Sequence, residues 1–168
     1  MNAAAPVVRP ARTSDVPGIR DLIDTYAPDR RLLSKATVTI YEDITDFLVA
    51  EIDGLLVGCG ALHVIWADVG EVRTLAVDPA RRGQGVGGSL LRALVQRARE
   101  LGVARVFCLT FETEFFSAYG FVEIDGTPVS HEVFEQLLES YDEGVAEFLN
   151  LERVKPNTLG NHRMLLEL

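Results

Sequence analysis

The feature that most constrains the fold of this chain is a glycine-rich turn between an alternating segment and a helical one. Residues 81–88 read Arg-Arg-Gly-Gln-Gly-Val-Gly-Gly. Residues 71–77 alternate as a strand, apolar residues recur at helical spacing from Val86 to Leu101, and Gly102 is placed to end the helix. Such a turn presents backbone N–H groups at the positive end of a helix dipole. The sequence therefore predicts a site for an anion here.

The rest of the chain predicts a mixed fold of short strands and helices. A strong hairpin is expected around Asp53-Gly54, because this pair accepts the positive φ angles of a tight turn. The strand at 105–110 must run parallel to that at 71–77, since a helical crossover joins them. The further strands are expected at 7–9, 46–52, 55–65, 121–124 and 164–168, with a turn at 68–70. The further helices are expected at 16–26 with Thr13 or Ser14 as the cap, at 36–44, at 115–119 and from 132 to about 141, followed by a loop that contains Pro156.

Length and composition favour one domain over residues 1–168. The chain has 168 residues, of which 48% are hydrophobic. This is enough to bury one sizeable core, but the chain is too short for two ordinary domains. It contains no run of the ~20 apolar residues that a membrane span needs, and its first ten residues do not resemble a signal peptide. A cytoplasmic protein with no membrane partner is therefore expected. Cys59 and Cys108 lie in apolar runs without metal-ligand spacing, which predicts buried thiols and no metal.

The charge of the chain argues against a nucleic-acid partner. The formal net charge is −9, whereas affinity for nucleic acid comes largely from lysine and arginine on phosphates. An anionic ligand must instead be held by a local cluster of cations. The basic residues form two such groups along the sequence, Arg30, Arg31 and Lys35 in one and Arg73, Arg81, Arg82 and Arg92 in the other.

Three kinds of anion site were compared for the glycine-rich turn. A nucleoside-triphosphate loop needs Gly-Lys-Ser/Thr, and neither residue follows Gly87. The turn does satisfy the dinucleotide pattern GxGxxG, with Glu112 as a ribose-binding acid, but the upstream hairpin does not suit a doubly wound sheet. The third pattern, Arg/Gln-x-x-Gly-x-Gly/Ala, is matched by Arg82, Gly85 and Gly87.

With this third pattern the chain resembles the GNAT superfamily of acyl-CoA N-acetyltransferases over nearly its whole length. The resemblance includes Thr74-Leu75-Ala76-Val77 before Asp78-Pro79, and residues 115–121, Phe-Phe-Ser-Ala-Tyr-Gly-Phe. It implies an α+β fold with a central, mostly antiparallel sheet of about six or seven strands, in which the fourth and fifth strands are parallel and splay apart. Helices flank this sheet. It also implies acetyl-CoA as co-substrate, held by Leu75, Ala76, Val77, Arg82, Gly83, Gln84, Gly85, Val86, Gly87 and Gly88.

The resemblance also implies catalytic roles. Glu71 matches a glutamate that accepts the proton of the attacking amine, through a water. Many relatives use a tyrosine as the general acid, but the matching position here is Phe116. Thr110 is therefore the preferred donor to the CoA sulfur. Tyr119 is a second candidate, although a role in core packing is expected for it.

Within the superfamily the chain looks most like the acetyltransferase domain of N-acetylglutamate synthases, without their amino-acid kinase domain. The segments that carry this likeness are 32–35, 57–62, 70–77 and 107–116. It implies an amino-acid acceptor, glutamate or glutamine, whose carboxylate would be held by Lys35 and Arg73. Glutamate would need a further cation, for which Arg30, Arg153 and Lys155 are candidates. Gly160-Asn161-His162 replaces the Arg-Asn-Ser that is frequent in the family's last strand.

Two other functions stay open on the sequence alone. An acetyltransferase for a protein N-terminus or a polyamine would need an acidic pocket, for which Glu112, Glu114 and Asp142 are available. A non-catalytic acyl-CoA sensor would bind CoA without turnover. A homodimer is expected from the family resemblance, but no interface can be located.

Overall fold

The computed structural model describes residues 4–29 and 35–168, and in these residues seven strands follow the predicted order. They are hydrogen bonded as β1-β2-β3-β4-β5-β7-β6, with β4 and β5 parallel and the pairs β1/β2, β2/β3, β5/β7 and β6/β7 antiparallel. The bounds are Val7–Pro10 (β1), Phe47–Ile52 (β2), Leu55–Trp66 (β3), Val69–Val77 (β4), Arg105–Thr110 (β5), Val122–Glu123 (β6) and His162–Glu167 (β7). The predicted fold class is confirmed.

The helices differ more from prediction than the strands do. The α-helices are Val16–Tyr26 (α1), Thr37–Glu42 (α2), Val86–Glu100 (α3), Thr113–Ser117 (α4), His131–Leu137 (α5), Glu143–Phe148 (α6) and Lys155–Thr158 (α7). Short 3-10 turns occupy Thr13–Asp15, Ala27–Asp29, Ile44–Asp46, Pro79–Arg81 and Glu152–Val154. The expected helix from 132 to about 141 ends at Leu137, α6 was not predicted, and Pro156 lies in the first turn of α7, where its missing N–H costs nothing.

Three local predictions were wrong for identifiable reasons. Thr13 and Ser14 do not cap α1, because the 3-10 turn places Asp15 at that position. Gly70 lies inside β4, where it pairs with Val106 rather than forming a turn. Leu101 follows the end of α3 at Glu100 and is exposed, whereas Leu91 and Val95 lie on the buried face of that helix.

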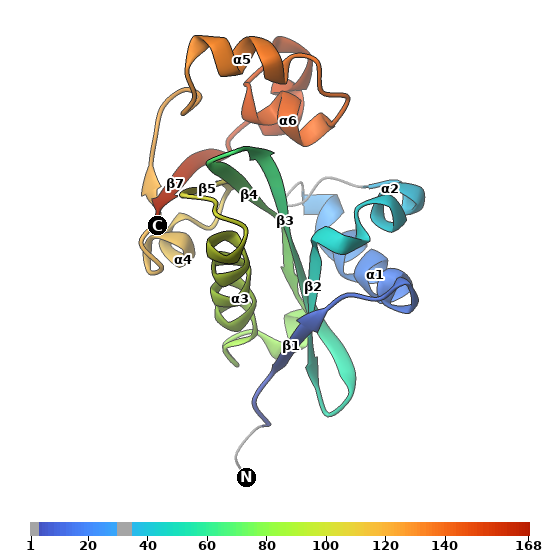
Figure 1. The fold of residues 1–168 in the computed structure, drawn as a ribbon. Helices are drawn as coiled ribbons and strands as arrows, with labels where there is room; N and C mark the ends of the chain where they lie inside the picture. The colour runs from blue at the N-terminus through green and yellow to red at the C-terminus, as the bar shows by residue number, and fades with distance from the viewer. Residues whose placement is uncertain (1–3, 30–34) are drawn as a thin grey trace. The chain divides into compact units, whose positions relative to one another are not determined.

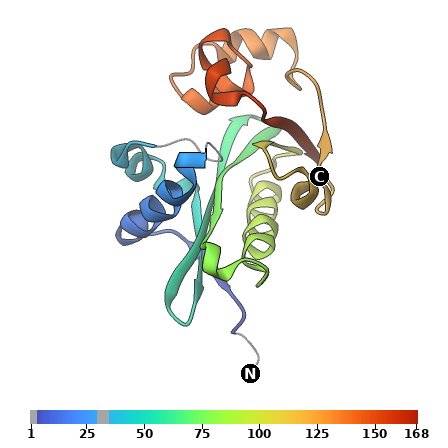
Figure 2. The ribbon, with the colours of Figure 1, turned by 180° about the vertical axis from the view of Figure 1, so that it is seen from behind.

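The described residues form two compact units, the first made of residues 4–29, 35–63 and 72–101. In this unit α1 and α2 cover one face of the strands and α3 covers the other (Figures 1 and 2). The buried residues beneath α1 and α2 are Val16, Ile19, Leu22, Ile23, Ile40, Phe47, Val49, Cys59, Ala61 and Ala76. Ala76, near the end of β4, belongs to this core. Its burial holds the end of β4 in place, just before the glycine-rich turn.

Two glycines of β3 allow α3 to lie directly on the strand. A Cβ added to Gly58 would lie 2.9 Å from both Leu90 Cδ1 and Val86 Cγ1, and one added to Gly60 would lie 2.9 Å from Leu94 Cδ1. Any larger residue at these positions would therefore displace the helix. The position of the N-terminus of α3 depends on this close approach.

The second unit consists of residues 64–71 and 102–168, with β5 at its centre. Helices α5 and α6 pack on the face of β5 and β7 that carries Phe107 and Leu165 (Figure 1). The rings of Phe107 and Phe148 meet edge to face, with centroids 4.9 Å apart. The buried residues of this cluster are Ile65, Val69, Phe107, Leu137, Val145, Phe148 and Leu149. The start of β4 belongs to this unit and pairs with β5 through residues 69–71.

Among the described residues, no helix combines the length and the apolar character that crossing a membrane requires. The same residues contain no cluster of three or more histidine, cysteine, aspartate or glutamate side chains that could hold a metal ion.

Candidate active site

The glycine-rich turn opens α3 with backbone that only glycine adopts readily. Asp78 ends β4, and its carboxylate accepts a hydrogen bond of 2.9 Å from the N–H of Ala80 in the next 3-10 turn. Gly83 and Gly85 have φ angles of +76° and +79°, and Gly85 is the N-cap of α3. A Cβ added to either glycine would meet no atom within 4 Å, so the backbone borders open space. The first N–H groups of an α-helix have no partner within it, which suits this turn to an anion.

A tyrosine of α1 connects the end of β4 to the turn. The hydroxyl of Tyr26 donates a hydrogen bond to the carbonyl oxygen of Val77. The guanidinium of Arg82 lies over the same ring, 5.6 Å from its centroid, and its Nη2 is 3.4 Å from the hydroxyl oxygen. Tyr26 thus orients Arg82, one of the residues that the resemblance predicts to hold acetyl-CoA. Its helical spacing had indicated only a packing role.

The segment of β4 before the turn contains a backbone irregularity. Thr74 has a φ angle of +56°, which is rare for a residue with a branched side chain. Its carbonyl oxygen accepts a hydrogen bond from the thiol of Cys59 on β3, with 3.5 Å between sulfur and oxygen. Burial raises the pKa of this thiol to about 12, an effect that the backbone N–H of Ala76 partly opposes. The next residues, Leu75 to Val77, are among those that the resemblance predicts to hold acetyl-CoA.

The two predicted catalytic residues lie in the second unit. Glu71 is 4% exposed and pairs with Phe107 of β5. Thr110 is buried at the end of β5, and its hydroxyl oxygen accepts a hydrogen bond of 2.8 Å from the N–H of Glu112. Because the oxygen accepts this bond, the O–H of Thr110 can donate to another group. Burial, and secondarily the charge of Glu71, raises the pKa of the neighbouring Cys108 thiol.

The two cations predicted to bind a substrate carboxylate lie in the first unit. Lys35 is half-buried just before α2, and its carbonyl oxygen accepts a bond of 2.7 Å from Arg20. Arg73 is half-buried in β4. Arg30, Arg31 and residues 32–34 lie outside the described residues.

Two further candidate cations for the substrate form ion pairs with neighbouring carboxylates. Arg153 pairs with Glu143 at 2.6 Å and Lys155 with Glu152 at 2.6 Å, both at the surface. The remaining candidates have structural contacts as well: Asp142 accepts the N–H of Val145 at the start of α6, His162 pairs with Glu123, Phe116 packs against Phe121, and Tyr119 lies against Phe115.

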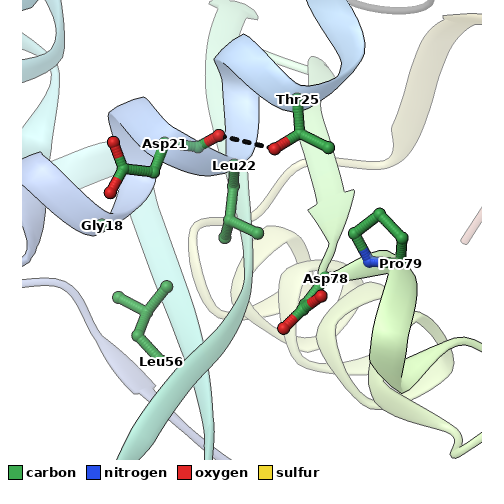
Figure 3. Close-up of a pocket in the computed structure, with 7 residues that line it drawn as sticks. All are labelled: Gly18, Asp21, Leu22, Thr25, Leu56, Asp78 and Pro79. Atoms are coloured by element: carbon green, nitrogen blue, oxygen red, sulfur yellow. Dashed lines mark hydrogen bonds between the residues drawn. The ribbon is translucent and has the colours of Figure 1, made fainter.

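A hollow of about 290 Å³ lies beside α1 in the first unit (Figure 3). It is lined by Gly18, Asp21, Leu22, Thr25, Leu56, Asp78 and Pro79. The hydroxyl of Thr25 donates within the helix to the carbonyl oxygen of Asp21 (Figure 3). The hollow contains two carboxylates and none of the predicted site residues, so it does not suit a pyrophosphate.

Comparison with known proteins decides the family. Residues 17–124 match the model of the Acetyltransferase (GNAT) family. The chain belongs to this family. It is 60% identical over 166 residues to an amino-acid acetyltransferase of Mycobacterium tuberculosis, covering 97% of this chain and 95% of that protein. The GNAT resemblance predicted from the glycine-rich turn is therefore confirmed.

Solved structures of GNAT proteins agree with this assignment. A crystal structure of a Mycobacterium tuberculosis protein in complex with CoA and NLQ has a TM-score of 0.94 and 60% identity, covering 96% of this chain and 99% of that chain. The N-acetylglutamate synthase of Neisseria gonorrhoeae, complexed with coenzyme A and N-acetyl-glutamate, has a TM-score of 0.78 and 28% identity. That alignment covers 98% of this chain and 35% of that chain.

Proposed function

We propose that this GNAT protein transfers the acetyl group of acetyl-CoA to the α-amine of a free amino acid, glutamate or glutamine. The observation that carries the proposal is 60% identity, over nearly the full length of both chains, to an amino-acid acetyltransferase. The glycine-rich turn supports it independently, because its open backbone and adjacent Arg82 suit a pyrophosphate.

Acetyl-CoA would bind along the end of β4 and the start of α3. The N–H groups at the start of α3 would receive the pyrophosphate, while Arg82, oriented by Tyr26, would add positive charge. The backbone of Leu75 to Val77 would hold the pantetheine arm. Since Ala76 is buried in the core and Leu75 and Val77 are half-buried, the main chain rather than the side chains is suited to this contact.

The chemical step would be a direct attack of the amine on the thioester. An α-amine is largely protonated at neutral pH, so Glu71 would accept one proton, through a water, before attack. The amine nitrogen then forms a bond to the carbonyl carbon. As the tetrahedral intermediate collapses, the carbon–sulfur bond breaks with its electron pair on sulfur, and one further proton leaves the nitrogen for that sulfur or for solvent, giving the amide and CoA. The O–H of Thr110 would donate to the departing sulfur, consistent with a hydroxyl whose oxygen already accepts the Glu112 N–H.

Lys35 and Arg73 are proposed to bind the carboxylate of the amino acid. For the side chain, glutamate would need a second cation and glutamine only amide hydrogen bonds. Arg153 and Lys155 are engaged with Glu143 and Glu152, and this disfavours them as that cation. Cytoplasmic location and a homodimer stay predictions.

The proposal is tested by a thiol-release assay with acetyl-CoA against the twenty amino acids, polyamines and short peptides. Turnover with glutamine or glutamate is expected, and their kcat/KM values rank the two side chains. Activity on a polyamine or a peptide alone would retain the CoA site and overturn the acceptor assignment. CoA binding without turnover of any amine would favour the sensor function.

The role of Glu71 needs a separate variant. Glu71→Gln is expected to keep its affinity for acetyl-CoA and to lose turnover by about 10²-fold or more, because the base is removed and the shape is retained. Thr39→Val, a half-buried change in α2, serves as the control. Turnover of Glu71→Gln at the wild-type rate would exclude Glu71 as the base.

A further inference from the structure

The guanidinium of Arg163 on β7 binds three backbone carbonyls from two separate segments. Its Nε donates to Gly126 at 2.8 Å, its Nη1 to Glu147 at 3.2 Å and its Nη2 to Phe148 at 2.5 Å. Glu147 and Phe148 end α6, where the carbonyl groups lack partners within the helix. A single side chain thus holds both ends of the segment 126–148.

The same guanidinium lies on the sheet face that carries Glu71. Arg163 is paired with Leu109 and Phe107 with Leu165, so Arg163 shares a face with Phe107. Its guanidinium carbon is 4.9 Å from the centroid of the Phe107 ring. Phe107 is in turn the parallel partner of Glu71, and directly paired residues project to the same side of a sheet. The cation and the carboxylate are therefore separated by one strand.

The charged groups around this face of β4, β5, β7 and α6 include Arg105 and Glu167, which are register partners, and Arg105 donates to Asp68 at 2.8 Å. Desolvation lowers the pKa of Arg163, and the charge of Glu71 acts in the opposite direction. On β5 the Cys108 thiol has a raised pKa and is neutral at working pH. On α6 the other buried carboxylate is Glu147, at 9% exposed. Of the two arginines on this face, Arg163 is the one that lies over Phe107, the register partner of Glu71.

From these contacts we infer that Arg163 is a positioning residue with two tasks. It fastens residues 126–148 to the sheet face through Gly126, Glu147 and Phe148, and it supplies positive charge, one strand away from Glu71, that keeps this carboxylate ionised. The second task rests on the proposed function of Glu71 as base, since only an ionised carboxylate can accept the proton. The first task is independent of the reaction.

The two tasks separate in two substitutions. Arg163→Lys keeps the charge but loses the planar fork that spans three carbonyls. Arg163→Gln removes the charge and keeps two N–H donors. The matched control is Arg153→Gln, which removes a surface arginine that lies outside the segment and pairs with Glu143 inside it.

Two measurements test these two roles of Arg163 without relying on enzyme activity. Carbon-13 NMR of glutamate-labelled protein follows the titration of Glu71, assigned with Glu71→Gln and distinguished from Glu147 with Glu147→Gln. Arg163→Gln is expected to raise the midpoint of Glu71 by roughly one pH unit, and Arg163→Lys to leave it close to that of the wild type. Amide exchange over residues 126–148 is expected to accelerate about tenfold in Arg163→Lys. Arg153→Gln is expected to change neither.

The outcomes separate this inference from the proposed function. An unchanged midpoint in Arg163→Gln, or one that rises equally in Arg163→Lys, would overturn the electrostatic task. Unchanged exchange in both variants would overturn the fastening task. If both tasks hold, the acid limb of the kcat/KM profile moves upward with the NMR midpoint. If the NMR and exchange results are as expected but the protein acetylates no amino acid, the inferred role of Arg163 holds and the proposed function is rejected.

Discussion

The thiol of Cys59 donates to the carbonyl oxygen of Thr74, the one residue of β4 with a positive φ angle among the described residues. This bond requires a protonated thiol, and burial supports it by raising the pKa of Cys59 to about 12. Burial raises the pKa of Cys108 as well. At pH 8 only about one Cys59 side chain in ten thousand is then a thiolate, the form that reacts.

We therefore expect a disulfide reagent to titrate no protein thiol in the native state at pH 8 and two thiols per chain in urea. The same reagent would then report only the CoA released by turnover. The measurement is the time course of reagent absorbance for the native protein and for the protein unfolded in urea. Rapid native titration of one thiol would show that Cys59 or Cys108 is accessible, which contradicts their burial.

Replacing Gly58 is expected to destabilise the first unit. In Gly58→Ala the added Cβ would lie 2.9 Å from Leu90 and Val86 and 3.2 Å from the carbonyl oxygen of Ala76. Overpacking of this kind costs about 1–3 kcal/mol, measured by urea unfolding. Because the Leu90 and Val86 side chains of α3 must give way, the affinity for CoA is expected to fall as well.

Gly18→Ala is the matched control for that substitution. Its added Cβ would lie 3.4 Å from Leu56, an ordinary contact, and Gly18 lies within α1. This change is expected to stabilise the protein by up to about 1 kcal/mol, because alanine has less freedom to lose in a helix. Equal destabilisation by the two changes would mean that close packing at Gly58 is not the cause.

The sequence predicted the strands well because their signals are local. The Asp53-Gly54 turn has the positive φ angles, +51° and +76°, that its residues favour. Helix α6 was missed because six residues show no usable periodicity, and its stability comes from tertiary contacts such as that of Phe148 with Phe107.

The sequence predicted only those parts of the candidate site that carry a local sequence motif. The glycines of the turn could be found, since positive φ at an anion site requires them. Tyr26 and Arg82 are 56 positions apart, and no pattern in either segment indicates that they meet. The left-handed backbone of Thr74 is equally invisible, because threonine is a typical strand residue.

Acid is expected to weaken the contact between β1 and the start of α1. Arg9 donates to Asp15 at 2.8 and 2.9 Å, and this bond lowers the pKa of the aspartate. A carboxylate with a lowered folded-state pKa adds stability above its unfolded pKa and loses it as pH falls through the folded value. In Asp15→Asn about 2 kcal/mol should be lost at pH 7 and less at pH 3, which lies below the ordinary aspartate pKa of 3.8, as measured by urea unfolding. Asp24→Asn, in an exposed pair with Arg20, should show little loss at either pH.

The last prediction separates backbone strain from ligand binding at the glycine-rich turn. Gly85 and Gly102 have φ angles of +79° and +81°, and an added Cβ would meet no atom within 4 Å at either position. Alanine at each position should therefore cost a similar amount, about 1 kcal/mol, in urea unfolding.

The two glycines differ in their place along α3, because Gly85 begins the helix and Gly102 follows its end. A pyrophosphate that approaches the start of α3 would meet the Cβ of Gly85→Ala and would be repelled by the carboxylate of Gly85→Asp. Calorimetry with CoA should give affinity in the order wild type, Gly85→Ala, Gly85→Asp, with Gly102→Ala equal to wild type. If Gly102→Ala weakens CoA as much as Gly85→Ala does, lost stability rather than the anion site explains the effect. If neither Gly85 variant weakens CoA, the pyrophosphate binds elsewhere.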